Sequence, residues 1–147
     1  MFAVQPEPLD ADALVRAVSR PDAGAVVLFY GVVRDHNLGR RVERLEYEAY
    51  PELARTVMRE AADEAKRRFP VLEVAAAHRT GALAVGEASL LVAVSSGHRA
   101  EAFAAGHWLV DRLKERLPVW KREVFEGGAE WLEGAPVTPP ETAGPSE

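Results

Sequence analysis

The sequence contains no cysteine among its 147 residues. This absence excludes disulfide bonds, thiolate nucleophiles, a persulfide carrier and cysteine-ligated metal clusters from the chain. The four histidines, His36, His78, His98 and His107, show none of the short spacings found in metal-binding motifs. We therefore expect this chain to hold neither a metal ion nor a cofactor.

Long apolar runs and an excess of basic residues are also missing. No apolar stretch approaches the roughly 20 residues that a membrane span needs, and the Met1-Phe2 start does not resemble a signal peptide. The net charge is −5, so the broad positive surface of a nucleic-acid-binding protein is not expected. We expect a cytoplasmic protein that binds neither membranes nor nucleic acid.

The residues that are present suit one globular domain, because 48% of them are hydrophobic and 28% are charged. Periodicity predicts helices over 10–19, 51–68 and 100–116, and strands over 25–33, 42–50, 71–78, 89–95 and 119–125. This order, β-β-α-β-β-α-β after a short N-terminal helix, predicts an α+β domain over 1–133 with a mainly antiparallel sheet and helices packed on one face. Some parallel pairing remains open. Residues 134–147 are rich in Pro, Gly and Glu and are expected to be disordered.

Several local expectations follow from the same patterns. The segment 25–33 is almost continuously apolar, which favours a strand buried on both faces. The segment 42–50 alternates and is predicted to be its half-exposed hairpin partner. Residues 1–9 contain prolines and are expected to be loosely held. Phe103 is expected to be buried by the last helix, whereas His78 is expected to pack at a strand end.

Basic residues gather in three clusters of this acidic chain: Arg34, His36, Arg40 and Arg41; His98 and Arg99; and Lys114, Arg116, Lys121 and Arg122. Each cluster follows the end of a strand or a helix, so all three can converge on one pocket. Local positive potential in an acidic protein favours a small anionic ligand such as a phosphate or a carboxylate. The alternative is a set of unrelated solvated side chains, and the segment 34–41 alone is equally consistent with an exposed hairpin loop.

Two lysines are candidates for chemistry. In a cleft with other cations, a lysine amine loses its proton more easily and becomes a nucleophile or a base. Lys114 can instead simply stabilise the C-terminal end of a helix through the helix dipole. Strand alternation places Lys121 and Glu123 on the same face, where a carboxylate can orient an ammonium group.

Six short segments follow one another along the chain: LFYGVVRDHN (28–37), EAYP (48–51), HRTG (78–81), SSGHR (95–99), LK (113–114) and PVWKRE (118–123). Taken together and in this order, they resemble the large, catalytic subunit of molybdopterin synthase. The resemblance runs from about residue 24 to residue 131 and weakens after Trp131, where basic residues of the family are absent.

The resemblance implies a sulfur transferase of molybdenum cofactor biosynthesis. Members of this family convert cyclic pyranopterin monophosphate to molybdopterin by building its dithiolene. The sulfur arrives as a thiocarboxylate on the C-terminal Gly-Gly of a small ubiquitin-like subunit, and the family forms a heterotetramer around a dimer of large subunits. A chain without cysteine agrees with sulfur supplied by a partner.

The resemblance also implies roles for particular residues. Lys114 corresponds to the catalytic lysine beside the thiocarboxylate, and Lys121 to the second lysine at the pterin. The positions implied to bind the substrate are Phe29, Arg34, His98, Arg99, Arg122 and Glu123. Two rival hypotheses are a non-catalytic α+β module that binds a phosphorylated metabolite and an inactive paralogue that keeps only the dimer interface. Neither of these two hypotheses requires the two lysines.

Overall fold

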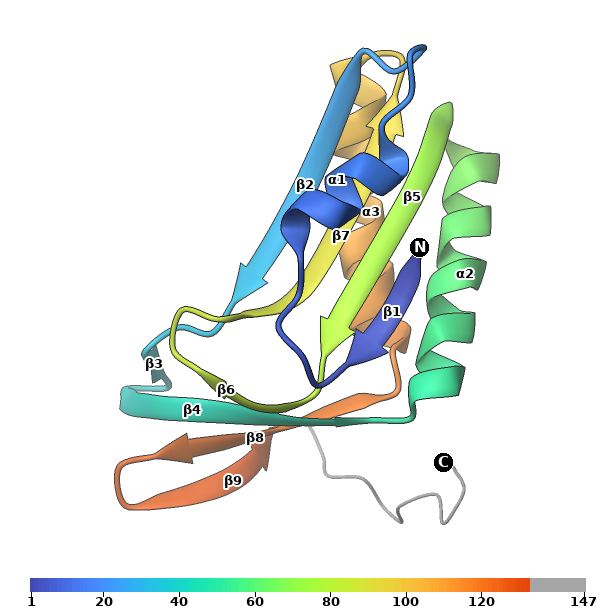
Figure 1. Cartoon of the computed structure of the whole chain (residues 1–147). Coiled ribbons are helices and arrows are strands. Elements are labelled where there is room, and N and C mark those ends of the chain that lie inside the picture. Colours follow the sequence, from blue (N-terminus) through green and yellow to red (C-terminus); the bar gives the residue numbers. More distant parts are fainter. Residues whose placement is uncertain (133–147) are drawn as a thin grey trace.

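The computed structural model describes residues 1–132, which form three helices and nine strands (Figure 1). The helices are α1 (Ala11–Val18), α2 (Pro51–Arg68) and α3 (Arg99–Arg116). The strands are β1 (Phe2–Gln5), β2 (Ala25–Val32), β3 (His36–Asn37), β4 (Arg40–Ala49), β5 (Val71–Arg79), β6 (Gly81–Ala84), β7 (Ala88–Ser96), β8 (Val119–Phe125) and β9 (Gly128–Leu132). The predicted disordered tail, 134–147, lies outside the described residues.

Simple end signals account for the helix boundaries. The Asp10 carboxylate accepts a hydrogen bond from the Ala13 N–H at 3.1 Å and caps α1. Pro51 begins α2, where its missing N–H costs nothing. Pro118 follows the last turn of α3, and β8 begins at the next residue. The predicted α+β class is confirmed, with mostly antiparallel pairing.

The first sheet has the strand order β1-β5-β7-β2. Strand β7 lies in the middle and every one of its residues is buried. Strand β1 runs parallel to β5, from Phe2 beside Ala76 to Gln5 beside Arg79. The expectation that residues 1–9 are loosely held is therefore wrong for 2–5, because backbone pairing with a distant strand fixes them.

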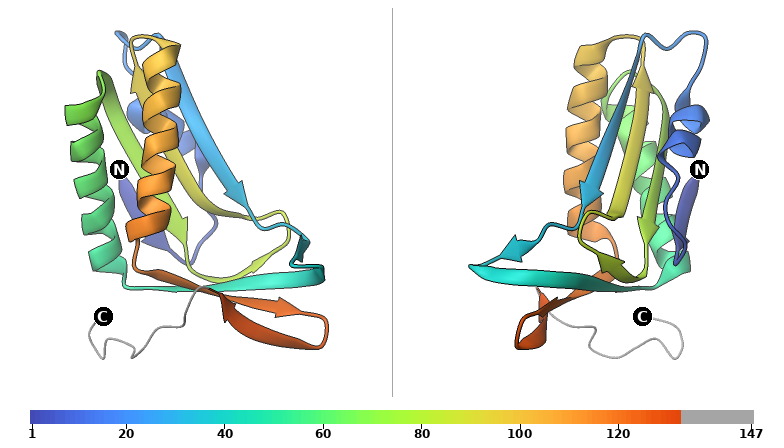
Figure 2. Two further views of the ribbon diagram at one scale, coloured as in Figure 1. Left: turned by 180° about the vertical axis from the view of Figure 1, so that it is seen from behind. Right: turned by 60° about the vertical axis from the view of Figure 1, so that its left-hand side comes forward.

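Helices cover both faces of the first sheet (Figure 2). The long helices α2 and α3 pack on one face, against alternate side chains of β5 and β7, including Val74, Ala76, Leu90, Val92 and Val94. The short helix α1 packs Leu14 and Val18 on the opposite face, against Ala75, Ala77, Leu91 and Ala93. The prediction of helices on one face holds for α2 and α3 only, because α1 covers the second apolar face that the same strands expose.

A second sheet crosses the end of the first (Figures 1 and 2). Its strand order is β3-β4-β8-β9, and β6 also pairs with β4. The expected hairpin between the segments 25–33 and 42–50 is wrong, since β2 pairs with β7 whereas β4 pairs with β3, β6 and β8. The chain leaves β2 at Val33, and the short β3–β4 hairpin then turns it into the second sheet.

Strand β2 is an edge strand, so the expectation that it is buried on both faces is wrong. Three of its apolar side chains, Val26, Tyr30 and Val32, are exposed, and so is Phe103 of α3, which was expected in the core. The start of β2 lies against the loop before α3, where Gly24 donates its N–H to Ser96 O at 2.9 Å. A Cβ atom at Gly24 would collide with the carbonyl oxygen of Gly97.

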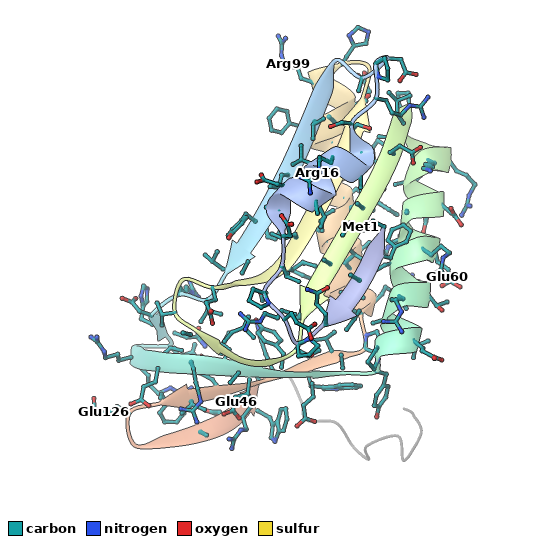
Figure 3. The ribbon with its side chains drawn as sticks, viewed as in Figure 1. Met1, Arg16, Glu46, Glu60, Arg99 and Glu126 are labelled. Atoms are coloured by element: carbon teal, nitrogen blue, oxygen red, sulfur yellow. The ribbon has the colours of Figure 1, made fainter. Side chains whose placement is uncertain are left out.

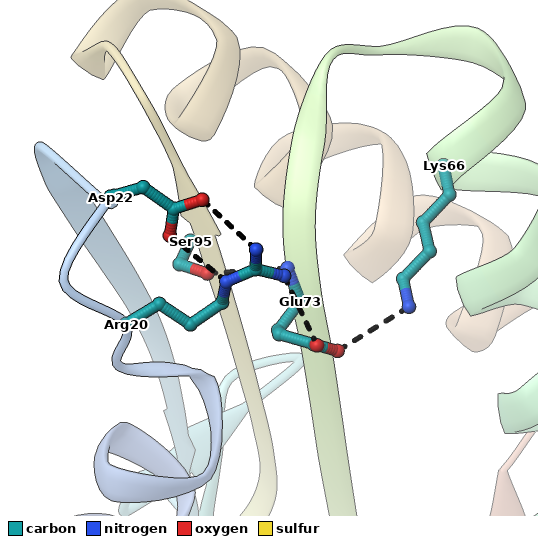
Figure 4. Close-up of polar contacts among 5 residues, drawn as sticks. All are labelled: Arg20, Asp22, Lys66, Glu73 and Ser95. Carbon is teal, nitrogen blue, oxygen red and sulfur yellow. Dashed lines mark hydrogen bonds and ion pairs between the residues drawn. The ribbon is translucent and has the colours of Figure 1, made fainter.

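Ion pairs connect the loop after α1 with β5 and α2 (Figure 4). Arg20 contacts Asp22 at 2.9 Å and Glu73 at 3.4 Å, and Glu73 also contacts Lys66 of α2 at 3.4 Å. These side chains are 40–56% exposed, and such exposed pairs contribute little to stability. Within residues 1–132, no helix is both long and apolar enough to cross a membrane.

Candidate active site

A pocket of about 260 Å³ lies where the two sheets meet. Its walls come from elements that are far apart in sequence: β2, the loop after it, β3, β4, β7, α3, β8 and β9. The lining residues that bear polar groups are Arg34, His36, Asn37, Tyr47, Ser89, Lys114, Lys121 and Glu123. Apolar walls come from Phe29, Val42, Leu45, Leu90 and Leu132, among others.

The two candidate lysines line this pocket together. Lys114 lies in the last turn of α3, and Lys121 lies on β8, which starts three residues after α3 ends. The predicted alternation is confirmed, because Lys121 and Glu123 both face the pocket. Arg34, which follows β2, joins the lysines and gives the pocket three cationic side chains.

Glu123 is the buried carboxylate of the site, with its side chain 2% exposed. It accepts hydrogen bonds from Asn37 Nδ2 at 2.9 Å and from an Arg40 guanidinium nitrogen at 3.0 Å. Arg40 also contacts Glu130 at 2.8 Å and lies over the Phe125 ring, 4.0 Å from its centroid. Glu123 thus attaches the β3–β4 hairpin to β8. Because Arg40 compensates its charge, the pocket as a whole remains cationic.

The remaining sequence candidates lie elsewhere in this chain. Arg99 begins α3, fifteen residues before Lys114, and a helix rises by 1.5 Å per residue, so the two lie about 22 Å apart along the axis. Figure 3 shows Arg99 at the end of the molecule away from Glu46 and Glu126 of the second-sheet region. His98 is the N-cap residue at the same end of α3, without a capping hydrogen bond from its side chain. Of the three basic clusters, the structure brings together members of only two.

Arg122 points to the face of the second sheet opposite Lys121. It forms hydrogen-bonded ion pairs with Glu46, from Nε at 2.9 Å and from a terminal nitrogen at 2.7 Å. The hydrogen bonds from Arg122 and Arg44 lower the pKa of the Glu46 carboxyl. Arg122 does not line the pocket.

Sequence reasoning gave no role to several residues that the structure places at the pocket. Tyr47 and Ser89 line it, and behind Tyr47 lies His78, whose side chain was expected only to pack. Burial lowers the pKa of His78 to about 4, with Lys114 and Lys121 adding to the shift, so its ring is neutral at pH 7. Alternation along β4 indicated the inward direction of Tyr47, but no local signal indicated what it meets.

The arrangement is suited to binding anions. Arg34 offers a planar set of N–H donors for a phosphate or carboxylate, and the two lysines supply ammonium groups nearby. No group of three or more His, Cys, Asp or Glu side chains within residues 1–132 is arranged to hold a metal ion. Fold and pocket together define an α+β protein with a lysine-bearing pocket whose charge is suited to a small anionic ligand.

Comparison with known proteins places the chain in a family: it belongs to the MoaE protein family, whose model matches residues 4–116. A Pyrococcus abyssi protein named molybdopterin synthase catalytic subunit is 48% identical over 130 residues, 88% of each chain. The crystal structure of molybdopterin synthase from Staphylococcus aureus is 34% identical with a TM-score of 0.86, covering 89% of this chain and 96% of that one. A complex of subunits 1 and 2 of the Helicobacter pylori molybdopterin-converting factor shares the fold, with a TM-score of 0.73, 21% identity and 90% coverage of both chains.

Proposed function

We propose that this chain is the catalytic subunit of a molybdopterin synthase and converts cyclic pyranopterin monophosphate to molybdopterin by sulfur transfer. The observation that supports this most strongly is the convergence of Lys114, Lys121 and Arg34 in one pocket, from three separate elements. The same segments carry the resemblance to the catalytic subunit, and the family membership agrees with it.

The proposed roles follow from charge and position. Arg34 binds the substrate phosphate through paired N–H donors. Lys114 contacts the incoming thiocarboxylate, and Lys121 contacts the pterin. Phe29 forms an apolar wall for the ring system, and Glu123 holds β8 and the β3–β4 hairpin in register around these groups. Arg122 is left out of the proposed site, because it pairs with Glu46 on the other face.

Sulfur supplied by a partner agrees with the absence of cysteine from the chain. We propose that the donor is a small ubiquitin-like subunit whose C-terminal Gly-Gly carries a thiocarboxylate. The Helicobacter pylori structure is a complex of two subunits, which supports a second subunit as the partner of a chain with this fold. A thiocarboxylate is an anion, so the ammonium groups of the pocket attract it as they attract the phosphate.

We propose that a dimer of catalytic subunits brings His98 and Arg99 of one copy to the pocket of the other. Strand β2 is an exposed edge with apolar side chains at Val26, Tyr30 and Val32, and two such edges can pair. Antiparallel pairing about a two-fold axis would place the first residue of one β2 opposite the last residue of the other. Eight strand residues span about 26 Å, close to the distance along α3 between Arg99 and Lys114. His98 and Arg99 of the second copy would then reach the pocket.

Mixing two inactive variants tests this dimer. In a dimer of two Lys114→Ala chains, or of two Arg99→Ala chains, both pockets lack one of the two residues and are inactive. In a mixed dimer, one of the two pockets keeps both residues. After subunit exchange, random pairing restores about a quarter of the pockets. Activity of the mixture near a quarter of wild type supports the shared site, whereas no gain over the separate variants contradicts it.

The function itself is tested by product formation with a thiocarboxylated small subunit. We expect Lys114→Ala to abolish dithiolene formation while the protein remains folded, because a pocket lysine adds little to stability. Lys66→Ala is the matched control, since Lys66 lies on the surface of α2 with its side chain 42% exposed. Equal turnover of the two variants would remove Lys114 from the reaction. Pterin binding without turnover in the wild type would favour the metabolite-binding module.

A further inference from the structure

His78 is a buried titratable side chain that the proposed chemistry does not use. It lies near the end of β5 and is 6% exposed. Its Nδ1 is 2.8 Å from the carbonyl oxygen of Arg79. A carbonyl oxygen only accepts hydrogen bonds, so Nδ1 carries the proton and donates it. This bond fixes both the tautomer and the orientation of the ring.

The ring of His78 contacts a wall of the pocket. It meets the Tyr47 ring edge to face, with 5.0 Å between the ring centroids and an interplanar angle of 69°. Tyr47 is 9% exposed and lines the pocket. Val33 and Leu83 pack against Tyr47 as well, but His78 is the aromatic ring that it contacts.

Tyr47 in turn lies beside the second lysine. It pairs with Lys121 across β4 and β8, and directly opposed residues of antiparallel strands have side chains on the same face. On its other side, Tyr47 pairs with Gly81 of β6, which has no side chain to support the phenol ring. A continuous set of contacts and cross-strand neighbours therefore runs from the Arg79 carbonyl through His78 and Tyr47 to Lys121.

The charge of this position matters as well as its shape. Lys114 on α3 and Lys121 on β8 are the charged groups that act on His78, while β4 and β7 face it with uncharged Tyr47 and Leu90. A cationic ring here would add a third positive charge beside the two ammonium groups. The neutral ring supports the wall without this repulsion.

We propose that His78 is a positioning residue of the pocket: its fixed, uncharged ring holds Tyr47 and, through Tyr47, keeps Lys121 in its working orientation. The consequence for turnover rests on the proposed function. The consequence for Lys121 itself does not, because the orientation of a side chain alters its accessibility to reagents whatever reaction the pocket catalyses.

Two substitutions separate the ring from its nitrogens. His78→Ala removes the support of Tyr47, whereas His78→Phe keeps a neutral ring for the edge-to-face contact. His107→Ala is the matched control, because the His107 side chain is 83% exposed on α3. Each full-length variant is first checked for folding by thermal unfolding, and its rates are expressed per folded molecule.

The first readout is independent of the proposed function. Acetic anhydride is added to each variant, and acetylation of Lys121 is measured by peptide mass spectrometry relative to Lys66 as an internal reference. We expect the Lys121-to-Lys66 ratio to change at least threefold in His78→Ala and to stay within about 1.5-fold of wild type in His78→Phe and His107→Ala, as side-chain placement controls access. An unchanged ratio in folded His78→Ala overturns the proposal, and so does a change of the same size in His78→Phe.

The second readout is synthase turnover with the thiocarboxylated partner. We expect kcat to fall roughly tenfold or more in His78→Ala, since small misplacements of reacting groups cost up to about a hundredfold, while KM for the pterin stays within threefold and His78→Phe recovers most of the rate. If His78→Ala does not fold, the Lys121-to-Lys66 acetylation ratio of His78→Phe decides, and a threefold change in that ratio overturns the proposal. If the wild type makes no product, the proposed function fails, whereas the acetylation result still decides the role of His78.

Discussion

Glu123→Gln removes one charge from the most buried ionic contact of the pocket with almost no change in shape. The carboxylate accepts one hydrogen bond from Asn37 and one from Arg40, at 2.9 and 3.0 Å. Gln keeps one oxygen acceptor, but its amide nitrogen is a donor and would face the N–H groups of Asn37 or Arg40, which are donors themselves. One charge-assisted hydrogen bond is lost, and one donor of the β3–β4 hairpin is left without a good acceptor.

The size of this loss can be bounded from the contacts. Removing one partner from a fully buried ion pair costs about 3–5 kcal/mol. Arg40 keeps its contact with Glu130 at 2.8 Å, so we expect a smaller loss for the Glu123 substitution, about 2 kcal/mol, typical of a hydrogen bond to a charged group. For a chain of this size, that corresponds to a decrease in Tm of roughly 4–8 °C.

Thermal and urea unfolding followed by circular dichroism measure this decrease. Glu130→Gln is the matched control, because Glu130 contacts the same arginine but is 47% exposed, and we expect its Tm to fall by less than half as much. A double-mutant cycle with Arg40→Met isolates the coupling between Glu123 and Arg40. A Glu123→Gln protein that unfolds within a degree of wild type, or no earlier than Glu130→Gln, would refute the reasoning about this contact.

Three further predictions concern stability and conformation. Leu38 has φ 52° and is 80% exposed at the tip of the β3–β4 hairpin, so Leu38→Asn should stabilise the fold by about 1 kcal/mol, seen as a higher urea midpoint; a lower midpoint would contradict this. The pKa of His78 is lowered to about 4, so between pH 7 and pH 5 this group binds a proton in the unfolded chain but not in the folded one. As the pH decreases from 7 to 5, the free energy of unfolding therefore decreases by about 2 kcal/mol through this group. His78→Phe should lose that part of the pH dependence, and an unchanged pH slope would count against the buried neutral ring. Gly24→Ala should lower Tm through the clash with the Gly97 carbonyl, and a Tm equal to wild type would show that the loop before α3 can shift.

Regular elements of this fold were predictable because their signals are local. Apolar periodicity and end signals located α2, α3, β7 and β8 to within a few residues. Alternation along β8 also predicted that Lys121 and Glu123 share a face, because strand geometry alone determines that relation.

Features that depend on distant partners were not predictable in this way. An apolar run does not distinguish a central strand from an edge strand, so β2 was expected to be buried on both faces. Helical periodicity likewise placed Phe103 in the core, although its side chain is exposed. Strand β1 has four residues and is held by β5, more than seventy positions later in the chain. The pairing of Arg40 with Glu123 spans 83 positions, and no local pattern indicates it.

The separation of His98 and Arg99 from the lysines has a simple geometric cause. Both groups lie at ends of strands or helices, which suggested one pocket. Arg99 and Lys114, however, lie at opposite ends of the 18-residue helix α3, and a straight helix cannot bring its own two ends together. Periodicity predicts the length of such a helix, but not how far each of its ends lies from the pocket.

Labelled sulfur tests directly whether this chain transfers sulfur to the pterin. The small subunit is charged with a ³⁵S-thiocarboxylate and mixed with the wild-type chain and cyclic pyranopterin monophosphate under single-turnover conditions. We expect the label to appear in a dithiolene product, in a reaction that Lys114→Ala abolishes and whose rate Lys66→Ala leaves unchanged. Label that remains on the small subunit, although that subunit binds and the chain is folded, would contradict sulfur transfer at this pocket.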